Sequence, residues 1–425
     1  MKRLFSFVWV WRGWLAVILV PVIVAIASGS GIWWLRLPGR LLGQAELRLS
    51  QGRTLEAVAS LETYVKRRPQ DSKTVLLLAR CLVEIGGASP NEKALKYLGA
   101  VPESDPLAGE ARWRAGNIAL LGLHRAAVAE RCYRKSVELD SDSVEAREGL
   151  LRIHWWQGRK SSEVFRWLEE IWQLGDLSQR RRALELLFWV RYGSFPLDLA
   201  LPVMEGFLSA DGSDYGARLG MARCMIMLKR YDEALTLCAG CVQEQPNDPL
   251  PRAILVDHAL VQGDWKTARS MLEDWPEQAW DLNYWSSRGE YLQQAEGRFA
   301  EAIDCFKRVL EDRPDRWAAR YRLSQCLEAL GQHERAERER ALSDRIGKAL
   351  LDTRVQRFLD EVLPNVDSRP QGCYEIADFF LEVGLEKDSQ KWQKLGQELE
   401  AQAARVKPTT EGQSDAASGM LGSLR

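Results

Sequence analysis

The chain has 425 residues and nearly balances its charges, with 58 basic and 59 acidic side chains and a net charge of −1 at pH 7. This balance gives no long-range field that would attract nucleic acid, so a nucleic-acid partner is not expected. The length exceeds that of one ordinary domain, although an array of repeats can grow lengthwise without a single large core.

The N-terminal segment, residues 1–36, contains a candidate membrane span. Residues 13–35 carry no charged side chain, and as a helix they measure about 34 Å at ~1.5 Å per residue, which is enough to cross a bilayer. Tryptophans near both ends suit the membrane interfaces. They are Trp9, Trp11, Trp14, Trp33 and Trp34. We expect an uncleaved anchor here, over the alternative of a signal peptide cleaved near Ala25 and Ala27.

The orientation of this span is poorly determined by the sequence. Basic residues flank it on both sides, so the positive-inside rule barely discriminates. The short preceding segment is typical of a signal-anchor, which favours the extracytoplasmic side for the rest of the chain and leaves the cytoplasmic side open. Small residues four positions apart, such as Ala25 and Gly29, permit helix dimerisation and leave a homo-oligomer open.

A repeat of 34 residues organises the middle of the chain. One column of alanines keeps this step (234 − 200 = 34), and glycines keep it five residues upstream. The alanines are Ala200, Ala234, Ala268, Ala302 and Ala336, and the glycines are Gly263, Gly297 and Gly331. Such a period indicates stacked helix-turn-helix units. Glycine permits the tight turn, and alanine is the small site where the two helices come closest.

These units resemble the tetratricopeptide repeat. Residues 285–314 match it best, with Trp285, Gly289, Ala302, Phe306 and Pro314 in order, and depart from it by one extra residue in the first helix. Looser units, including 52–69 and 143–174, extend the resemblance to roughly nine helix pairs over 38–347. The resemblance implies an all-α, right-handed superhelical solenoid of stacked repeats, preceded by one transmembrane helix.

The pattern softens toward the C-terminus. Residues 336–363 predict one long charged helix that caps the array with a polar outer face, and 373–406 predict one more degenerate helix pair with Gly384 at its turn. The segment 348–406 is therefore interpreted as a helical cap or degenerate repeat. Residues 407–425, rich in Gly, Ser and Thr, predict a disordered tail.

The cysteines could suggest redox or metal chemistry. Cys238 and Cys241 form a C-x-x-C, the spacing of a thioredoxin-like pair or half a zinc site. However, Cys224 and Cys326 lie three whole periods apart (326 − 224 = 102), which favours buried hydrophobic positions that recur with the repeat. We therefore expect no metal and no cofactor. Histidines are few and scattered, and no nucleotide-binding or catalytic motif occurs, so an enzyme is not expected.

The resemblance further implies a concave groove lined by the first helix of each unit. Side chains that share one register position on these helices, together with their neighbours, are aromatic or hydrogen-bonding and would suit an extended peptide or a partner helix. The candidate partner-binding residues are Trp155, Trp156, Trp189, Arg223, Asp257, Tyr321, Arg322 and Gln325, with Tyr291 in the same register. A clamp for acidic C-terminal tails is not expected, because Trp113 stands before Asn117 where that clamp needs a lysine.

Taken together, these features predict a membrane-anchored scaffold or adaptor that binds a protein partner through its groove, in the assembly of an envelope or secretion complex. Such a layout, one span followed by repeats, is an analogy to bacterial envelope proteins. The alternatives are a dedicated chaperone for an exported client, such as an apo-cytochrome, and an enzyme whose active site lies within 348–406.

Overall fold

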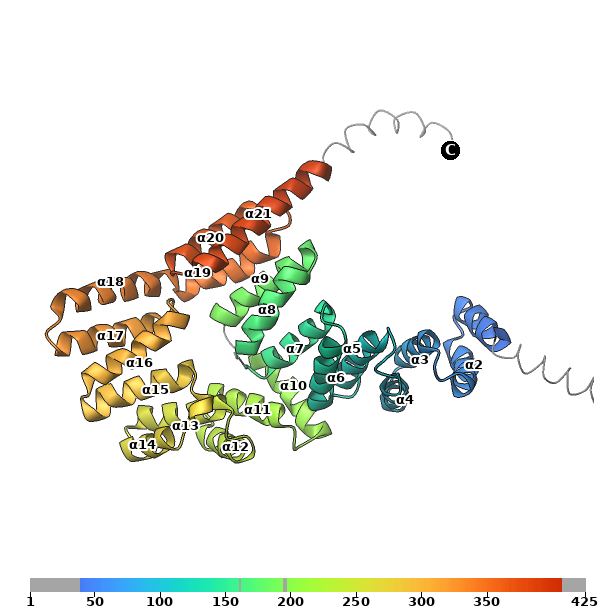
Figure 1. Ribbon diagram of the computed structural model, residues 1–425, viewed down its shortest axis with the longest axis horizontal. Coiled ribbons are helices and arrows are strands. Elements are labelled where there is room, and N and C mark those ends of the chain that lie inside the picture. The colour runs from blue at the N-terminus through green and yellow to red at the C-terminus, as the bar shows by residue number, and fades with distance from the viewer. Residues whose placement is uncertain (1–38, 160–161, 194–196, 407–425) are drawn as a thin grey trace, which may run out of the picture. The chain divides into compact units, whose positions relative to one another are not determined.

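A computed structural model describes residues 39–159, 162–193 and 197–406 (Figure 1). Every regular element in these ranges is a helix. The chain divides into two compact units, residues 1–146 and 147–425, which are described separately below. The predicted anchor at 13–35 and the predicted tail at 407–425 lie outside the described residues. Within the described part of the chain, no helix is both long enough and apolar enough to cross a bilayer.

Unit 1 is a run of antiparallel helix pairs. Its elements are a helix at 39–50, α2 (Thr54–Arg67), α3 (Ser72–Ile85), α4 (Ala88–Gly99), α5 (Ala108–Asn117) with the π-helix η1 (Ile118–Gly122), and α6 (Ala126–Leu139). Leu61, Leu78 and Leu98, one from each of three successive helices, are fully buried in one apolar core. Burial of such side chains is the main favourable contribution to the stacking of the pairs.

Unit 2 continues the same alternation for most of its length. Its elements are most of α7 (Val144–Trp156), then α8 (Ser162–Leu174), α9 (Leu177–Tyr192), α10 (Leu197–Ala210), α11 (Tyr215–Met227), α12 (Tyr231–Glu244), α13 (Pro249–Gln262), α14 (Trp265–Glu273), η2 (Glu277–Ala279), α15 (Leu282–Tyr291), η3 (Leu292–Glu296), α16 (Phe299–Asp312), α17 (Trp317–Ala329), α18 (His333–Ala349), α19 (Asp352–Arg357), η4 (Phe358–Val362), η5 (Leu363–Asn365), α20 (Gln371–Glu382) and α21 (Glu386–Val406). The described residues between 39 and 349 form nine helix pairs, as the repeat predicts.

The column alanines and the column glycines occupy the structural positions that the 34-residue repeat predicts. All five column alanines are fully buried, at 0% exposure, as expected where two helices cross closely. Gly263, Gly297 and Gly331 have φ between 65° and 71°, the left-handed region that glycine tolerates best. In the unit of Ala234 the glycine is replaced: Lys229, 34 residues before Gly263, takes φ 61° instead. The backbone of this turn therefore keeps its shape even with an unfavourable residue.

The extra residue of the best-matched unit is absorbed by a π-helical turn. The helix begun by α15 continues through η3, Leu292–Glu296, before the turn at Gly297. A π-turn accommodates one inserted residue locally, so the helix segments on either side keep their packing. Gly289 still faces Phe306, whose ring would lie 2.8 Å from a Cβ added at Gly289. The π-helix η1 has the same place at the end of a first helix in unit 1.

The C-terminal part of unit 2 differs from the prediction of one long helix over 336–363. Helix α18 ends at Ala349, Leu351 adopts extended backbone with ψ 135°, and α19 begins at Asp352. Gly347 lies in the last turn of α18, and no glycine or proline stands between Ala349 and Asp352. The break redirects the chain so that η4 can bury Phe358 against another part of the unit.

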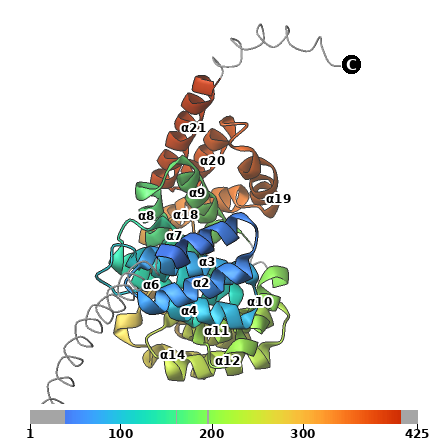
Figure 2. The same ribbon diagram turned by 90° about the vertical axis from the view of Figure 1, so that its right-hand side faces the viewer.

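Unit 2 closes on itself. Helices α20 and α21 lie beside α9, near the start of the unit, in both views (Figure 1, Figure 2). Five rings meet in this contact, with centroids 5.2–6.0 Å apart, and we call them the aromatic cluster. They are Phe188, Tyr192, Phe358, Phe379 and Phe380. The face that α20 turns toward α9 is therefore apolar.

Candidate functional site

Successive first helices of unit 2 place one side chain each at an equivalent position. Each residue lies 11 positions before a column alanine, once α15 is corrected for the π-turn in η3, and the five come from α9, α11, α13, α15 and α17. They are Trp189, Arg223, Asp257, Glu290 and Gln325, and we call them the stripe. Side-chain contacts join the stripe across α13, α15 and α17: Ser287 on α15 donates to Asp257 on α13, and Glu290 on α15 pairs with Arg322 on α17.

The N-terminal end of the stripe is aromatic. Trp155 on α7 and Trp189 on α9 meet edge to face, with ring centroids 6.0 Å apart. Both tryptophans are partly exposed. Trp156 instead lies against Phe207 of α10, at 6.1 Å between centroids, so it contributes to packing between helices. Of the two predicted tryptophans on α7, only Trp155 contacts the stripe.

Charged groups occupy the middle of the stripe. The Asp257 side chain is exposed to solvent at its surface, but protein atoms surround much of it. This partial burial raises the pKa of Asp257, and the hydrogen bond from Ser287 and the charge of Arg316 lower it by less. Ser287 Oγ donates a hydrogen bond to Asp257 Oδ1 at 2.8 Å, which joins α15 to α13. On α11, burial lowers the pKa of the Arg223 guanidinium, which is partly exposed. Charges in such a partly enclosed position interact more strongly with a ligand than charges on an open surface.

The C-terminal end of the stripe is a polar pocket. Arg322 forms an ion pair with Glu290 at 2.9 Å, and Gln293 Nε2 donates to Gln325 Oε1 at 3.1 Å. Burial raises the pKa of Glu290, and the charge of Arg322 opposes this shift. A pocket of about 540 Å³ is lined by Gln293, Gln294, Arg322 and Gln325 among others. Glutamine amides and a guanidinium can donate to and accept from a peptide backbone, so this pocket suits a polypeptide chain.

Tyr291 was expected in the stripe, and the structure corrects this. Tyr291 is 8% exposed and belongs to the core between α13 and α15, with its hydroxyl bonded to Glu296 Oε1 at 3.0 Å. The reason is the π-turn, which shifts the register by one residue and brings Glu290 to the stripe. The sequence held a signal for this shift, because counting forward from Trp285 instead of backward from Ala302 gives Glu290. Tyr321 is exposed on α17 one turn before Gln325. The partner-binding role of all these residues stays a prediction.

The C-x-x-C cysteines are part of the helix packing. Cys238 and Cys241 are fully buried in α12 and form no disulfide. Burial, with a smaller contribution from Cys241, raises the pKa of Cys238 to about 12, so the thiolate needed for redox exchange or metal binding is disfavoured. Within the residues that the structure describes, no group of three or more Cys, His, Asp or Glu side chains is placed to hold a metal ion.

Comparison with known proteins concerns the repeat region. A family model described as tetratricopeptide repeat matches residues 197–255, 228–290 and 293–342. The sequence has no significant match among curated proteins. Solved structures with a similar arrangement include the Cut9–Hcn1 complex of the APC/C, at 14% identity and a TM-score of 0.37 over 91% of this chain and 95% of that chain.

Two further solved structures are similar at the same level. A tetratricopeptide repeat protein from Parabacteroides merdae is 15% identical, with a TM-score of 0.30 over 69% of this chain and 99% of that chain. Yeast Tom70 is 13% identical, with a TM-score of 0.32 over 88% of this chain and 99% of that chain. Similarities at these TM-scores carry no argument about function, so the assignment rests on the family model and on the helix pairs themselves. Repeats of this kind generally act as scaffolds for protein–protein interactions. Residues 197–290 and 293–342 of this chain are therefore similar to the tetratricopeptide repeat.

Proposed function

We propose that this protein is a scaffold that binds a protein partner through the stripe. The observation that carries the proposal is the stripe itself: five successive first helices present Trp189, Arg223, Asp257, Glu290 and Gln325 at one register position. A stacked array extends such a surface over many residues, which suits an extended segment of a partner.

The partner is proposed to be a polypeptide in an extended or helical conformation. The aromatic end at Trp155 and Trp189 offers apolar contact area, and the pocket at Gln293 and Gln325 offers amide hydrogen bonds. Aromatic anchors and amide groups at opposite ends would fix both the position and the direction of a bound segment.

We further propose that residues 13–35 tether this scaffold to a membrane, with the repeats on the extracytoplasmic side. Their uncharged run and the flanking tryptophans support the tether. In that setting the scaffold would act in the assembly of an envelope or secretion complex. This assignment is supported by the layout of one span followed by repeats, which is an analogy.

Photo-crosslinking in isolated membranes tests the proposal. A crosslinking amino acid replaces Asp257 or Gln325 on first helices, and Lys307 on the second helix α16 serves as the matched control, since its side chain is half exposed. We expect one protein to be captured from the two stripe positions and not from Lys307. The triple variant Trp189→Ala/Arg223→Glu/Gln325→Ala, crosslinked at Asp257, should lose it while keeping its helical circular dichroism. Equal capture from Lys307 would refute the stripe as the binding surface.

A further inference from the structure

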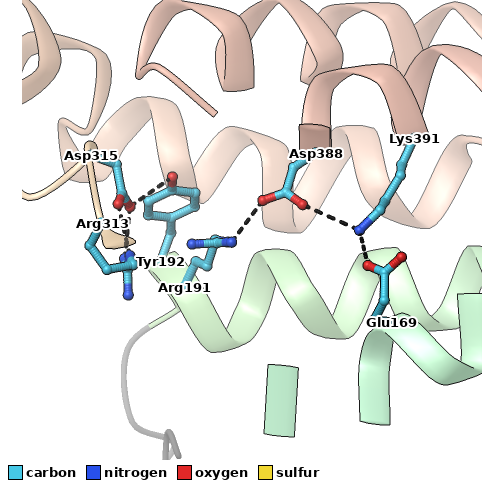
Figure 3. A network of polar contacts seen from close by, with 7 residues as sticks. All are labelled: Glu169, Arg191, Tyr192, Arg313, Asp315, Asp388 and Lys391. Carbon is cyan, nitrogen blue, oxygen red and sulfur yellow. Dashed lines mark hydrogen bonds and ion pairs between the residues drawn. The ribbon is translucent and has the colours of Figure 1, made fainter. Parts of the chain in front are cut away.

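The contact that closes unit 2 joins residues about 200 positions apart in the chain. Arg191 Nη2 on α9 donates to Asp388 Oδ2 on α21 at 2.8 Å, and Lys391 on α21 pairs with both Asp388, at 3.6 Å, and Glu169 on α8 (Figure 3). The side chains of Arg191 and Asp388 are 12% and 9% exposed. In a solenoid each unit normally contacts only its neighbours, so this contact is an addition to the repeat packing.

Helix α9 also contacts the turn between α16 and α17. The Tyr192 hydroxyl donates to Asp315 Oδ2 at 3.1 Å, and Arg313 Nη2 donates to the same oxygen at 2.7 Å (Figure 3). Burial acts to raise the pKa of Asp315, but the hydrogen bond and charge of Arg313 outweigh it and hold this pKa below its usual value. Asp315 therefore stays ionised and keeps the turn between α16 and α17 against α9.

The polar contacts surround an apolar centre. Phe188 on α9 is fully buried, and its ring lies 5.6 Å from Phe379, 5.9 Å from Phe380 and 5.7 Å from Phe358 between centroids. Arg180 on α9 pairs with Glu398 on α21 at 2.9 Å on the rim of the same contact. The closure thus has the composition of a small protein interface, with an aromatic core and a charged rim.

This interface is incompletely satisfied. Arg191 Nε and Nη1 are buried without a hydrogen-bond acceptor among the described residues, and so are Arg180 Nε and, on the acceptor side, Glu398 Oε2. Buried polar groups without partners lose their hydration and weaken the state that buries them. Opening the interface would return these groups to water.

The closure also borders the proposed binding surface. Trp189, the first residue of the stripe, lies in α9 between Phe188, which α20 covers, and Arg191, which α21 holds. We propose that α20–α21 form a releasable latch on α8–α9, and that its release opens the stripe to the partner. The gating of a partner rests on the proposed function; the opening of the latch does not.

Charge reversal on the rim tests the latch. Arg180→Glu and Glu398→Arg each replace an attraction with a like-charge contact, and the double variant restores an ion pair with exchanged signs. Arg298→Glu, which breaks an exposed pair with Glu301 on α16, is the matched control. Hydrogen–deuterium exchange of the full chain reports opening without any partner, since amides in a transiently open element exchange faster.

We expect each single reversal to speed exchange in α9 and α20 roughly fivefold, since a partly exposed pair contributes only modestly. Exchange in α13–α17 should stay unchanged, and the double variant and the control should match the unaltered protein. Crosslinking from Asp257 should rise in the single variants.

Unchanged exchange, or a uniform rise across unit 2, would overturn the latch. Faster exchange without a rise in crosslinking would overturn its gating role. A failure of the unaltered protein to crosslink at all would refute the proposed function, while the exchange result would still decide whether the latch opens.

Discussion

The aromatic cluster gives the sharpest prediction. Phe188→Ala removes a fully buried ring that lies within 5.9 Å of four other rings between centroids. Replacing a buried phenylalanine with alanine costs about 3–5 kcal/mol, from the lost burial and the cavity that remains. At about 2–4 °C per kcal/mol for a unit of 150–250 residues, the melting temperature should fall by roughly 6–20 °C.

The effect of this change should be confined to the closure. Phe306→Ala is the control, because Phe306 is equally buried but lies in the core that joins α15, α16 and α17. Both variants should lose similar stability in thermal unfolding followed by circular dichroism. Hydrogen–deuterium exchange should then rise in α20 for Phe188→Ala and in α15–α17 for Phe306→Ala. If both variants raise exchange in the same helices, unit 2 opens only as a whole and the separation of closure from repeats is refuted.

Three further predictions concern the turns, the stripe and the N-terminal segment. Lys229→Gly should raise the free energy of unfolding by about 0.5–1 kcal/mol, because glycine adopts the left-handed backbone at φ 61° without the steric strain of a lysine. Gly263→Ala should lower the free energy of unfolding by a similar amount, and urea unfolding measures both. Burial raises the pKa of Asp257, so its ionised form costs stability in the folded chain; Asp257→Asn should raise the melting temperature at neutral pH. This gain should vanish as the pH falls through the raised pKa toward the ordinary aspartate value, and a constant gain would contradict the reasoning. Deleting residues 1–36 should move the protein from the membrane pellet to the supernatant after ultracentrifugation, and retention in the pellet would place the tether elsewhere.

The repeat architecture could be predicted because each unit repeats the same turn and the same helix crossing. A left-handed turn requires glycine, and a close helix crossing requires a small side chain, so both leave a column at a fixed step. Gly263 and Ala268 illustrate this: their roles follow from spacing alone. Lys229 shows the limit of the signal, since the turn persists there without the residue that favours it.

The closure of unit 2 could not be predicted in the same way. Phe188 and Phe380 are 192 residues apart (380 − 188 = 192), and neither belongs to a periodic column that would relate them. Their contact depends on how small rotations accumulate over the intervening repeats, which no single segment encodes. The register error at Tyr291 has a different cause, because counting forward from Trp285 gives Glu290 whereas counting backward from Ala302 gives Tyr291, and only the structure shows that the extra residue is absorbed after Tyr291, in η3.

The π-turn at η3 adds one side chain to the pocket surface of its repeat and leaves the fold of the repeat unchanged. In a regular helix, consecutive residues point about 100° apart and rarely serve the same ligand. Here both Gln293 and Gln294 line the pocket beside Arg322, while Ala302 and Phe306 of the same repeat remain fully buried. An array of this kind can therefore change its specificity through the length of a single repeat, as an alternative to exchanging one residue type for another.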